Sequence, residues 1–426
     1  MNMNRLHSGF GPILPYILVI FAALAASLLC AGNASGYSGR VIDAATRMPI
    51  AGALVTLNDT VVRTDSDGRF AISAHGERIG ARAYGYLRAN TALDPRRESY
   101  DFELTPFKPK ALYLSFYGVG SSTIRRNALN LIEATELNAL VIDVKGDRGM
   151  VPYLSGVPLA AKVGAQQVIT VKDIKGLLQD LQRRQIYTIA RIVVFKDNPL
   201  ATARPELAVR RGGAIFLDRE RLRWTDPFRQ EVRDYNIAIA VEAARLGFDE
   251  IQFDYLRCPD ARGVVFSKPN TLRNRVAAID EFLDQARKAL TPYNVFLAID
   301  IFGYVNWNLD DTQIGQQLED LGPRVDYISP MLYPSGYQFG IPGYRNPVAH
   351  PYEIVYLSLK RARERTGLPP IRFRPWLQAF RDYAFDRREF GGNEIRTQIN
   401  AAEKFGSDGW MLWNPRNVYS GAGLMK

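Results

Sequence analysis

The sequence predicts an α/β fold, a (β/α)8 TIM barrel preceded by a small all-β sandwich. From residue 111 onward, eight apolar, strand-like runs alternate with amphipathic helical stretches. Between residues 37 and 105, shorter runs alternate apolar and polar side chains with period two and are separated by Asp and Gly turns. A chain of 426 residues with 47% hydrophobic content can bury a core in each of these two parts.

The barrel prediction covers residues 110–420. Parallel barrel strands are buried on both faces, so they are expected to be nearly continuously apolar. The strand-like runs span 111–118, 139–146, 187–195, 249–257, 295–303, 325–333, 371–380 and 409–414. The main helical stretches between them span 173–184, 230–246, 272–290, 352–366 and 392–405. A doubly wound open sheet is the alternative. It is disfavoured because Gly118-Val119-Gly120-Ser121 lacks the third glycine of a dinucleotide fingerprint and the Gly-Lys of a P-loop.

The first 34 residues have the pattern of an export signal. Arg5 and His7 precede an apolar run from Ile13 to Leu29, and a small-residue stretch begins at Cys30. The run is also long enough for an uncleaved membrane anchor, so cleavage and anchoring both stay open. A lipoprotein signal is disfavoured, because Leu29 stands where a small residue is expected before the lipidated cysteine. We therefore expect an exported protein, periplasmic or extracellular, with possible attachment to the inner membrane.

Composition excludes several classes of function. The 54 Lys+Arg and 44 Asp+Glu residues give a net charge of +10, but acids and bases are interspersed, as in Arg219-Glu220-Arg221. This pattern favours a solvated mixed-charge surface over a nucleic-acid interface. The three histidines have no metal-ligand spacing and no Gly-x-Ser-x-Gly elbow occurs, so we expect neither a metal, nor a cofactor, nor a serine nucleophile. With only two cysteines, one of them in the predicted signal, no intrachain disulfide is expected in the mature chain.

Polar and aromatic residues end the predicted strands. In a TIM barrel these ends meet at one mouth, where active sites lie. Carboxylates, amides and aromatic faces together suit a sugar. The predicted substrate-binding residues are Tyr117, Asp143, Lys145, Asp147, Arg191, Gln252, Arg257, Tyr333, Trp376, Gln378, Trp413 and Asn414. Two alternatives stay open: Asp143 and Lys145 form only a salt bridge, and the two tryptophans belong to the core.

Asp254 and Asp300 are the predicted catalytic pair. Each interrupts an apolar strand, where a carboxylate is costly unless it is paired or functional, and Arg257 is the expected partner of Asp254. Carboxyls on neighbouring barrel strands fall within the separations that glycosidases use. We predict Asp254 as the nucleophile or charge stabiliser and Asp300 as the general acid/base. Asp143 and Asp147 are rivals for the second role. Asp249 and Glu250 are expected at the opposite end of the barrel, solvated or capping.

The segment from Gly247 to Arg257, with the core Ile251-Gln252-Phe253-Asp254-Tyr255, resembles the strand-four motif of a bacterial family of glycoside hydrolases distantly similar to alpha-amylase-like barrels. Matching stretches occur at 141–145, 190–197, 224–227, 327–334 and 409–414, so the resemblance spans 110–419. It implies that Asp254 is the nucleophile. By analogy it places the acid/base on strand five, where alpha-amylase-like barrels have Glu and this chain has Asp300. Cys258 stands where an aromatic residue is expected.

Residues 37–105 are similar to the carboxypeptidase regulatory-like, transthyretin-like module. The similarity lies in Gly39-Arg40-Val41, in 49–53, in Thr64-Asp65-Ser66-Asp67-Gly68 and in 83–86. It implies an accessory role. Asp65 and Asp67 fit either a calcium loop or a hairpin turn, and the turn is favoured because Asp67-Gly68 needs no metal.

The sequence thus predicts a glycoside hydrolase that acts on a cell-envelope or extracellular polysaccharide, α-linked or containing amino sugars, by a two-carboxylate mechanism. The alternative is a non-catalytic carbohydrate-binding or scaffold protein of the cell envelope. A metal-dependent deacetylase is disfavoured because no ligand cluster is found. The oligomeric state is not predicted.

Overall fold

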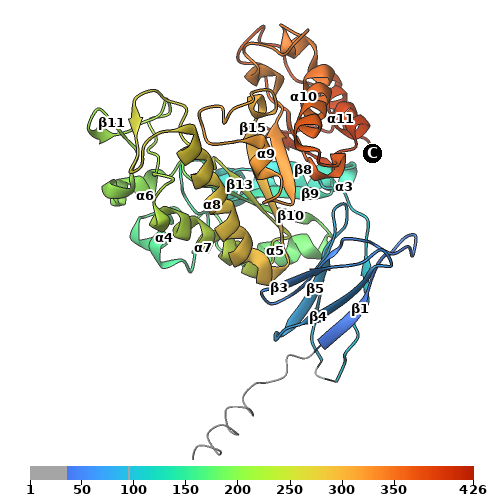
Figure 1. Cartoon of the computed structure of the whole chain (residues 1–426). Helices are drawn as coiled ribbons and strands as arrows, with labels where there is room; N and C mark the ends of the chain where they lie inside the picture. Colours follow the sequence, from blue (N-terminus) through green and yellow to red (C-terminus); the bar gives the residue numbers. More distant parts are fainter. Residues whose placement is uncertain (1–35, 95) are drawn as a thin grey trace, which may run out of the picture.

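A computed structural model describes residues 36–94 and 96–426 (Figure 1). The predicted export signal, residues 1–34, lies outside the described residues. Within the described ranges, no helix combines the length and the apolarity needed to cross a membrane.

The N-terminal β part consists of two small sheets around a shared core. One sheet has the order β4-β1-β7 and the other β3-β2-β5-β6. All neighbouring strands are antiparallel except β1 and β7. Their bounds are β1 (Gly36–Asp43), β2 (Leu54–Leu57), β3 (Thr60–Arg63), β4 (Arg69–Ser73), β5 (Arg78–Arg82), β6 (Ala89–Ala92) and β7 (Phe102–Leu104). Val41, Val55, Phe70 and Phe102 lie in the common core, as the period-two pattern predicts.

The Asp65 loop is closed as a turn. Asp65 Oδ1 accepts hydrogen bonds from the amides of Asp67 (2.9 Å) and Arg69 (2.8 Å), and Gly68 has φ +72°. The carboxylate is thus used within the loop, which supports the turn over the calcium loop.

The rest of the chain forms a closed parallel barrel with strand order β10-β13-β15-β16-β17-β18-β8-β9. This confirms the predicted (β/α)8 fold class. The strands are β8 (Lys110–Leu114), β9 (Ala139–Lys145), β10 (Tyr187–Val193), β13 (Glu250–Asp254), β15 (Phe296–Phe302), β16 (Tyr327–Met331), β17 (Trp376–Gln378) and β18 (Trp410–Trp413). Each lies within a predicted run, apart from Lys110 at the start of β8. The strand predicted over 371–380 shrinks to β17, because residues from Pro370 to Arg372 form a 3-10 turn.

Helices surround the barrel (Figure 1). The long ones are α3 (Ser122–Ala134), α5 (Ile174–Arg183), α7 (Gln230–Leu246), α8 (Leu272–Leu290), α10 (Pro351–Thr366) and α11 (Gly392–Phe405). Short helices are α2 (Phe116–Gly120), α4 (Pro158–Lys162), α6 (Asn198–Ala203) and α9 (Leu318–Leu321). The 3-10 turns are η1 (Pro205–Leu207), η2 (Thr291–Tyr293), η3 (Gly303–Asn306), η4 (Pro334–Gly336), η5 (Pro347–Ala349) and η6 (Pro370–Arg372), and a small sheet joins β11 (Arg210–Arg211), β12 (Ala214–Ile215) and β14 (Val264–Val265).

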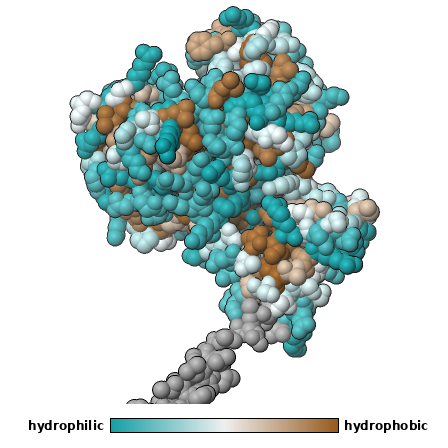
Figure 2. All heavy atoms as spheres, viewed as in Figure 1, coloured by the Kyte–Doolittle hydropathy of each residue, from teal (hydrophilic) through white to brown (hydrophobic). Residues whose placement is uncertain are grey.

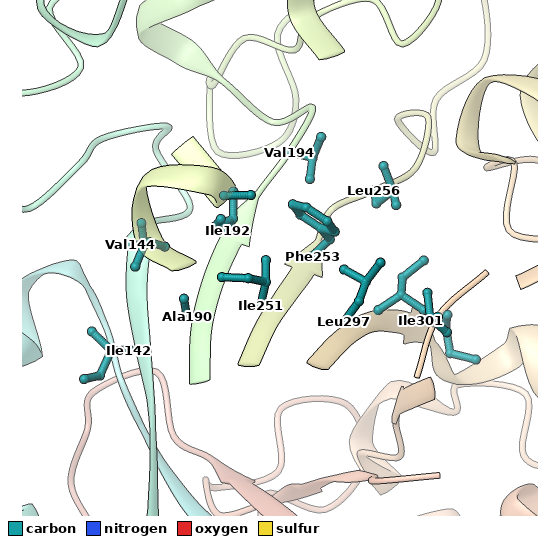
Figure 3. Packing of buried hydrophobic residues seen from close by; sticks show 14 of the residues in the cluster. Ile142, Val144, Ala190, Ile192, Val194, Ile251, Phe253, Leu256, Leu297 and Ile301 are labelled. Atoms are coloured by element: carbon teal, nitrogen blue, oxygen red, sulfur yellow. The ribbon is translucent and has the colours of Figure 1, made fainter. Parts of the chain in front are cut away.

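Successive side chains of each barrel strand point alternately to the helices and to the barrel axis. Outward residues such as Ile142, Ile192 and Phe253 belong to the large cluster between strands and helices, and Figure 3 shows this cluster beside β9, β10, β13 and β15. Inward residues such as Val141 and Ala298 fill the barrel itself. The interior is therefore closed below the mouth.

The bottom of the barrel is held by buried charges. Arg374 donates to both carboxylate oxygens of Glu250 (2.7 and 2.6 Å) and to Asp408 (2.9 Å), and the hydroxyl of Tyr187 donates to Glu250 (3.1 Å). Glu250 is at the predicted end of the barrel, but the prediction that it is solvated is wrong. Its side chain faces the barrel interior, where only pairing with Arg374 makes a carboxylate tolerable. Asp249 accepts from the amide and hydroxyl of Thr188, each at 3.0 Å, and so caps the β10 start as expected.

The β part packs against this bottom face (Figure 1). Asn294, just before β15, accepts from Arg82 Nη1 (2.9 Å) and donates to the Ala89 carbonyl (3.1 Å). Arg88 donates to the Phe248 carbonyl, just before β13 (2.9 Å). Since strand beginnings define the bottom, the β part lies at the end of the barrel opposite the mouth. The face in Figure 2 is mostly hydrophilic, with apolar patches on both parts.

Candidate active site

A cavity of about 270 Å³ opens at the mouth of the barrel. Its walls come from the ends of β10, β13, β15, β16, β17 and β18 and from the loops that follow them. Six of the predicted site residues line it, and most of the remaining lining is aromatic. The lining residues are Arg191, Asp254, Tyr255, Arg257, Phe302, Gly303, Tyr304, Met331, Tyr333, Gly336, Tyr337, Trp376, Tyr383 and Trp413.

Asp254 closes β13 at a strained turn. The next residue, Tyr255, has φ +48°, a left-handed conformation that is unfavourable for an aromatic residue. This turn aims the Tyr255 amide at Asp254 Oδ1 (2.6 Å). Oδ2 accepts from Arg191 Nε (3.0 Å) and Nη2 (2.6 Å). The carboxylate is only 5% exposed, so its orientation is fixed on both oxygens.

Arg191, rather than Arg257, neutralises Asp254. Its guanidinium is 1% exposed and also donates to Asp143 (2.6 Å) and Asp147 (2.8 Å). It lies over the ring of Trp413, 4.9 Å from the centroid. The prediction that Arg257 pairs with Asp254 is wrong, because Arg191 projects from the adjacent strand β10 into the same space.

Asp143 is held as firmly as Asp254. Its Oδ2 accepts from the Tyr113 hydroxyl (2.8 Å) and from the Phe116 amide (3.0 Å). Burial, together with the nearby charge of Asp147, raises the pKa of Asp143 to about 6 against the lowering effect of Arg191. Asp147 is the more accessible of these two acids, with a side chain 38% exposed.

Asp300 lies on the neighbouring strand. Phe253 is in register with Ile299, so Asp254 and Asp300 are the next residues of β13 and β15, and both face the barrel axis. Asp300 Oδ1 accepts from Trp376 Nε1 (2.7 Å), while its buried Oδ2 has no hydrogen-bond partner among the described residues. Burial, and then the charge of Asp254, hold the pKa of Asp300 well above its ordinary value. Asp300 is thus suited to carry a proton.

Aromatic side chains form the upper wall of the cavity. Trp413 stacks on Tyr113 with ring centroids 4.0 Å apart, and Trp376 meets both rings edge-on. Both tryptophans line the cavity and also contact the core, so the two interpretations of them are compatible. Tyr333, another predicted residue, lines the same wall.

The sequence analysis missed several lining aromatics. Phe302 and Tyr304 follow β15, while Tyr337 and Tyr383 lie in the loops after β16 and β17. The available signal was the density of aromatic residues just beyond these strand ends, as in Phe302-Gly303-Tyr304. Only residues within the predicted strands were counted, and these rings lie mostly beyond them.

Arg257 lines the cavity in a different way. Its guanidinium lies 5.0 Å from the Trp224 centroid and 5.1 Å from that of Tyr255, and it donates to the Cys258 carbonyl (3.1 Å). The two rings hold the cation in place while part of it faces the cavity.

Lys145 is not brought to the cavity. An extra residue in β9 shifts the register, so that Lys145 pairs with Ile192 and faces the helices. Its ammonium is fully buried, donates to Asn236 Oδ1 (2.8 Å) and pairs with Asp197 (2.6 Å). The predicted substrate contact is therefore replaced by a structural ion pair. The alternative pairing with Asp143 is also wrong.

Three other predicted residues are used within the protein, and one stands apart. Gln252 donates to Ser329 Oγ inside the barrel (3.2 Å), Gln378 donates to Ser335 Oγ (2.7 Å), and Asn414 donates to the Ala379 carbonyl (2.6 Å). Tyr117 is 60% exposed on α2 and does not line the cavity. No group of three or more His, Cys, Asp or Glu side chains is placed to hold a metal ion in the part of the chain that the structure describes.

The closed parallel barrel and the acids and aromatic rings at its mouth define a protein of the glycoside hydrolase class. The chain belongs to the family described as "Putative glycosyl hydrolase domain", whose profile matches residues 111–419. This confirms the family resemblance found for the barrel.

Solved structures show the same architecture. The glycoside hydrolase domain of PgaB (BpsB) from Bordetella bronchiseptica matches with a TM-score of 0.53 at 14% identity, covering 73% of this chain and 95% of that one. A hypothetical protein from Ruminiclostridium thermocellum is 36% identical over 44% of this chain and 96% of its own, with a TM-score of 0.40. A class V chitinase from Pseudomonas fluorescens matches at 16% identity, with a TM-score of 0.43 and coverage of 75% and 96%. No curated protein sequence matches the chain.

Proposed function

We propose that this protein hydrolyses glycosidic bonds of a cell-envelope or extracellular polysaccharide with Asp254 and Asp300 as its two carboxylates. The observation that carries the proposal is their contrast. Asp254 is ion-paired with Arg191, whereas Asp300, on the adjacent strand, has a strongly raised pKa. Two acids whose environments differ in this way can divide the acid and charge-stabilising roles.

In this mechanism, Asp300 supplies the proton to the leaving glycosidic oxygen. Asp254 faces the positive charge that develops on the sugar ring, as nucleophile or charge stabiliser. Adjacent parallel strands lie about 4.8 Å apart, which is compatible with the carboxyl separation of roughly 5–5.5 Å in retaining enzymes. Arg191 positions Asp254 through two nitrogens of its planar guanidinium.

Aromatic rings supply the sugar-binding surface. Trp413, Tyr333 and Tyr304 present faces or edges to the cavity, and aromatic faces pack well against the apolar side of a pyranose. Together with export of the mature chain, which the first 34 residues predict, this favours an extracytoplasmic, α-linked or amino-sugar polysaccharide as substrate.

The test is hydrolysis of a polysaccharide panel by wild type and by Asp254→Asn. We expect the variant to lose at least about 100-fold in kcat, the magnitude typical of removing a catalytic carboxylate. Asp260→Asn is the matched control, because Asp260 is an exposed acid in the loop after the same strand and lies outside the cavity lining. Equal activity of Asp254→Asn and Asp260→Asn would remove Asp254 from the mechanism.

A non-catalytic glycan-binding protein is the second candidate. One observation favours it: both oxygens of Asp254 already accept hydrogen bonds within the protein. A binder would retain oligosaccharides and release them intact after long incubation, whereas a hydrolase would shorten them. Chromatographic analysis of the bound glycan separates the two.

A further inference from the structure

Three aromatic residues connect the cavity to the outer surface. Phe302 and Tyr304 line the cavity, and their ring centroids lie 5.9 Å apart. Phe339 follows Tyr304 at 6.4 Å but is not part of the lining. We call Phe302, Tyr304 and Phe339 the aromatic track. It leads from the predicted site of bond cleavage to the rim of the mouth.

Phe339 is exceptionally exposed. Its relative exposure is 82%, the highest among the large hydrophobic residues that the structure describes as exposed. A single exposed apolar residue needs no explanation, but an exposed aromatic ring contiguous with a cavity marks a binding surface. The position of Phe339 next to Tyr304 is therefore the informative feature.

The backbone around Phe339 is held rigid. The Phe339 amide donates to the Tyr304 hydroxyl (2.9 Å), which in turn donates to the Gly340 carbonyl (3.2 Å). Gly340 has φ +70°, and a Cβ there would lie 2.4 Å from the Tyr344 carbonyl oxygen. The turn thus requires glycine and is fixed by the same tyrosine that lines the cavity. A ring on such a turn loses little conformational entropy when it binds a ligand.

We propose that the aromatic track is an extended glycan subsite, so that the enzyme binds several sugar units of a polymer and cleaves within the chain. The inference rests on the proposed glycan-directed function. A carbohydrate chain is the occupant favoured here, because the track is continuous with the cavity of a glycosyl hydrolase domain and presents rings rather than aliphatic side chains. A cavity of about 270 Å³ has room for only a small part of a polymer, so the remaining units must lie outside it.

The test measures binding as a function of chain length. Oligosaccharides from disaccharide to hexasaccharide, of the malto-, cello-, chito- and deacetylated chito- series, are titrated calorimetrically into the Asp254→Asn protein, which prevents turnover. We expect the affinity to rise with chain length. Adding Phe339→Ala should reduce the affinity for the longer members by roughly three- to tenfold, the range expected for one aromatic contact.

Two further substitutions separate stacking from general hydrophobicity. Phe339→Trp should preserve the gain with chain length, and Phe339→Leu should lose it. Leu309→Ala is the control, because Leu309 is 72% exposed and apolar but is not part of the cavity lining or the track.

Three results would overturn the inference: affinity that does not increase with length, a Phe339→Ala protein that matches Leu309→Ala, or the absence of binding to every series. The last result also removes the proposed function. Length-dependent binding through Phe339 without hydrolysis would leave the extended subsite standing and remove only the catalytic proposal. Hydrolysis that releases single terminal units and ignores Phe339 would do the reverse.

Discussion

The indole nitrogen of Trp376 donates a 2.7 Å hydrogen bond to Oδ1 of Asp300, and it is the one side-chain donor to this buried carboxyl among the described residues. The bond favours the ionised form, whereas burial and the charge of Asp254 favour the protonated form more strongly. The balance among these three effects sets the pH range in which Asp300 can donate a proton.

Trp376→Phe tests this balance. Without the indole donor, the ionised form of Asp300 is less stable, so the pKa of Asp300 should rise further. A general acid acts in its protonated form, and activity is lost as pH rises through its pKa. The basic limb of the kcat profile should therefore move to higher pH. A limb that stays in place while kcat falls would limit Trp376 to a packing role.

Asp300→Asn should exchange activity for stability. The folded-state pKa of Asp300 lies above its ordinary value of 3.8, so the folded protein binds this proton more tightly than the unfolded chain. Stability is then lost as pH rises from about 3.8 to the folded pKa, and it stays low above that.

The asparagine variant avoids this cost because it cannot ionise. It should denature at higher temperature than wild type at pH 8, with the difference vanishing near pH 3, and its kcat should fall roughly 10²- to 10⁴-fold. Calorimetric scans across pH, with Asp260→Asn as control, measure the first effect. A difference that is independent of pH would contradict the ionisation argument.

Arg191→Met should destabilise the barrel strongly. Three acids, Asp143, Asp147 and Asp254, would lose their shared cation, and removing one partner of a buried ion pair costs about 3–5 kcal/mol. Arg191→Lys should restore little, since an ammonium cannot reproduce the planar, multidentate contacts. The control is Arg183→Met, because Arg183 pairs with Asp180 at the surface and such pairs contribute at most about 1 kcal/mol. Urea denaturation of the three variants gives the comparison.

The predictability of the fold has a physical basis. Alternation of apolar strands and amphipathic helices identified the barrel, because a parallel strand buried on both faces has no alternative composition. Position along a strand then indicated that Asp254 and Asp300 face inward. The sequence could not reveal the bulge in β9, which depends on its pairing with β10 and turns Lys145 toward the helices.

Partner choice was equally hidden. Arg257 is close to Asp254 in sequence, but Arg191, sixty-three positions away, makes the ion pair because β10 and β13 are neighbours in the barrel. The aromatic track was missed for the same reason. Phe302 and Phe339 lie in different loops, and only the closed barrel places them around Tyr304.

Asn294 provides a test of how the β part is attached. It lies at the bottom of the barrel with φ +51°, a left-handed conformation that glycine adopts without strain. Asn294→Gly therefore keeps the backbone and removes the side chain that accepts from Arg82 and donates to the Ala89 carbonyl. Leaving the buried Arg82 without this acceptor should weaken the attachment by about 1–3 kcal/mol.

The expected result is faster amide hydrogen exchange in β5 and β6, with little change in the barrel strands. Glycan hydrolysis should be unaffected, because the mouth lies at the other end of the barrel. Asn58→Gly is a closely matched control: Asn58 has the same φ of +51° but lies exposed in the turn between β2 and β3. Equal exchange rates in Asn294→Gly and Asn58→Gly would mean that the side chain of Asn294 does not hold the two parts together, and the attachment would then rest on the Arg88 contact and the packing of Tyr84 on Tyr327.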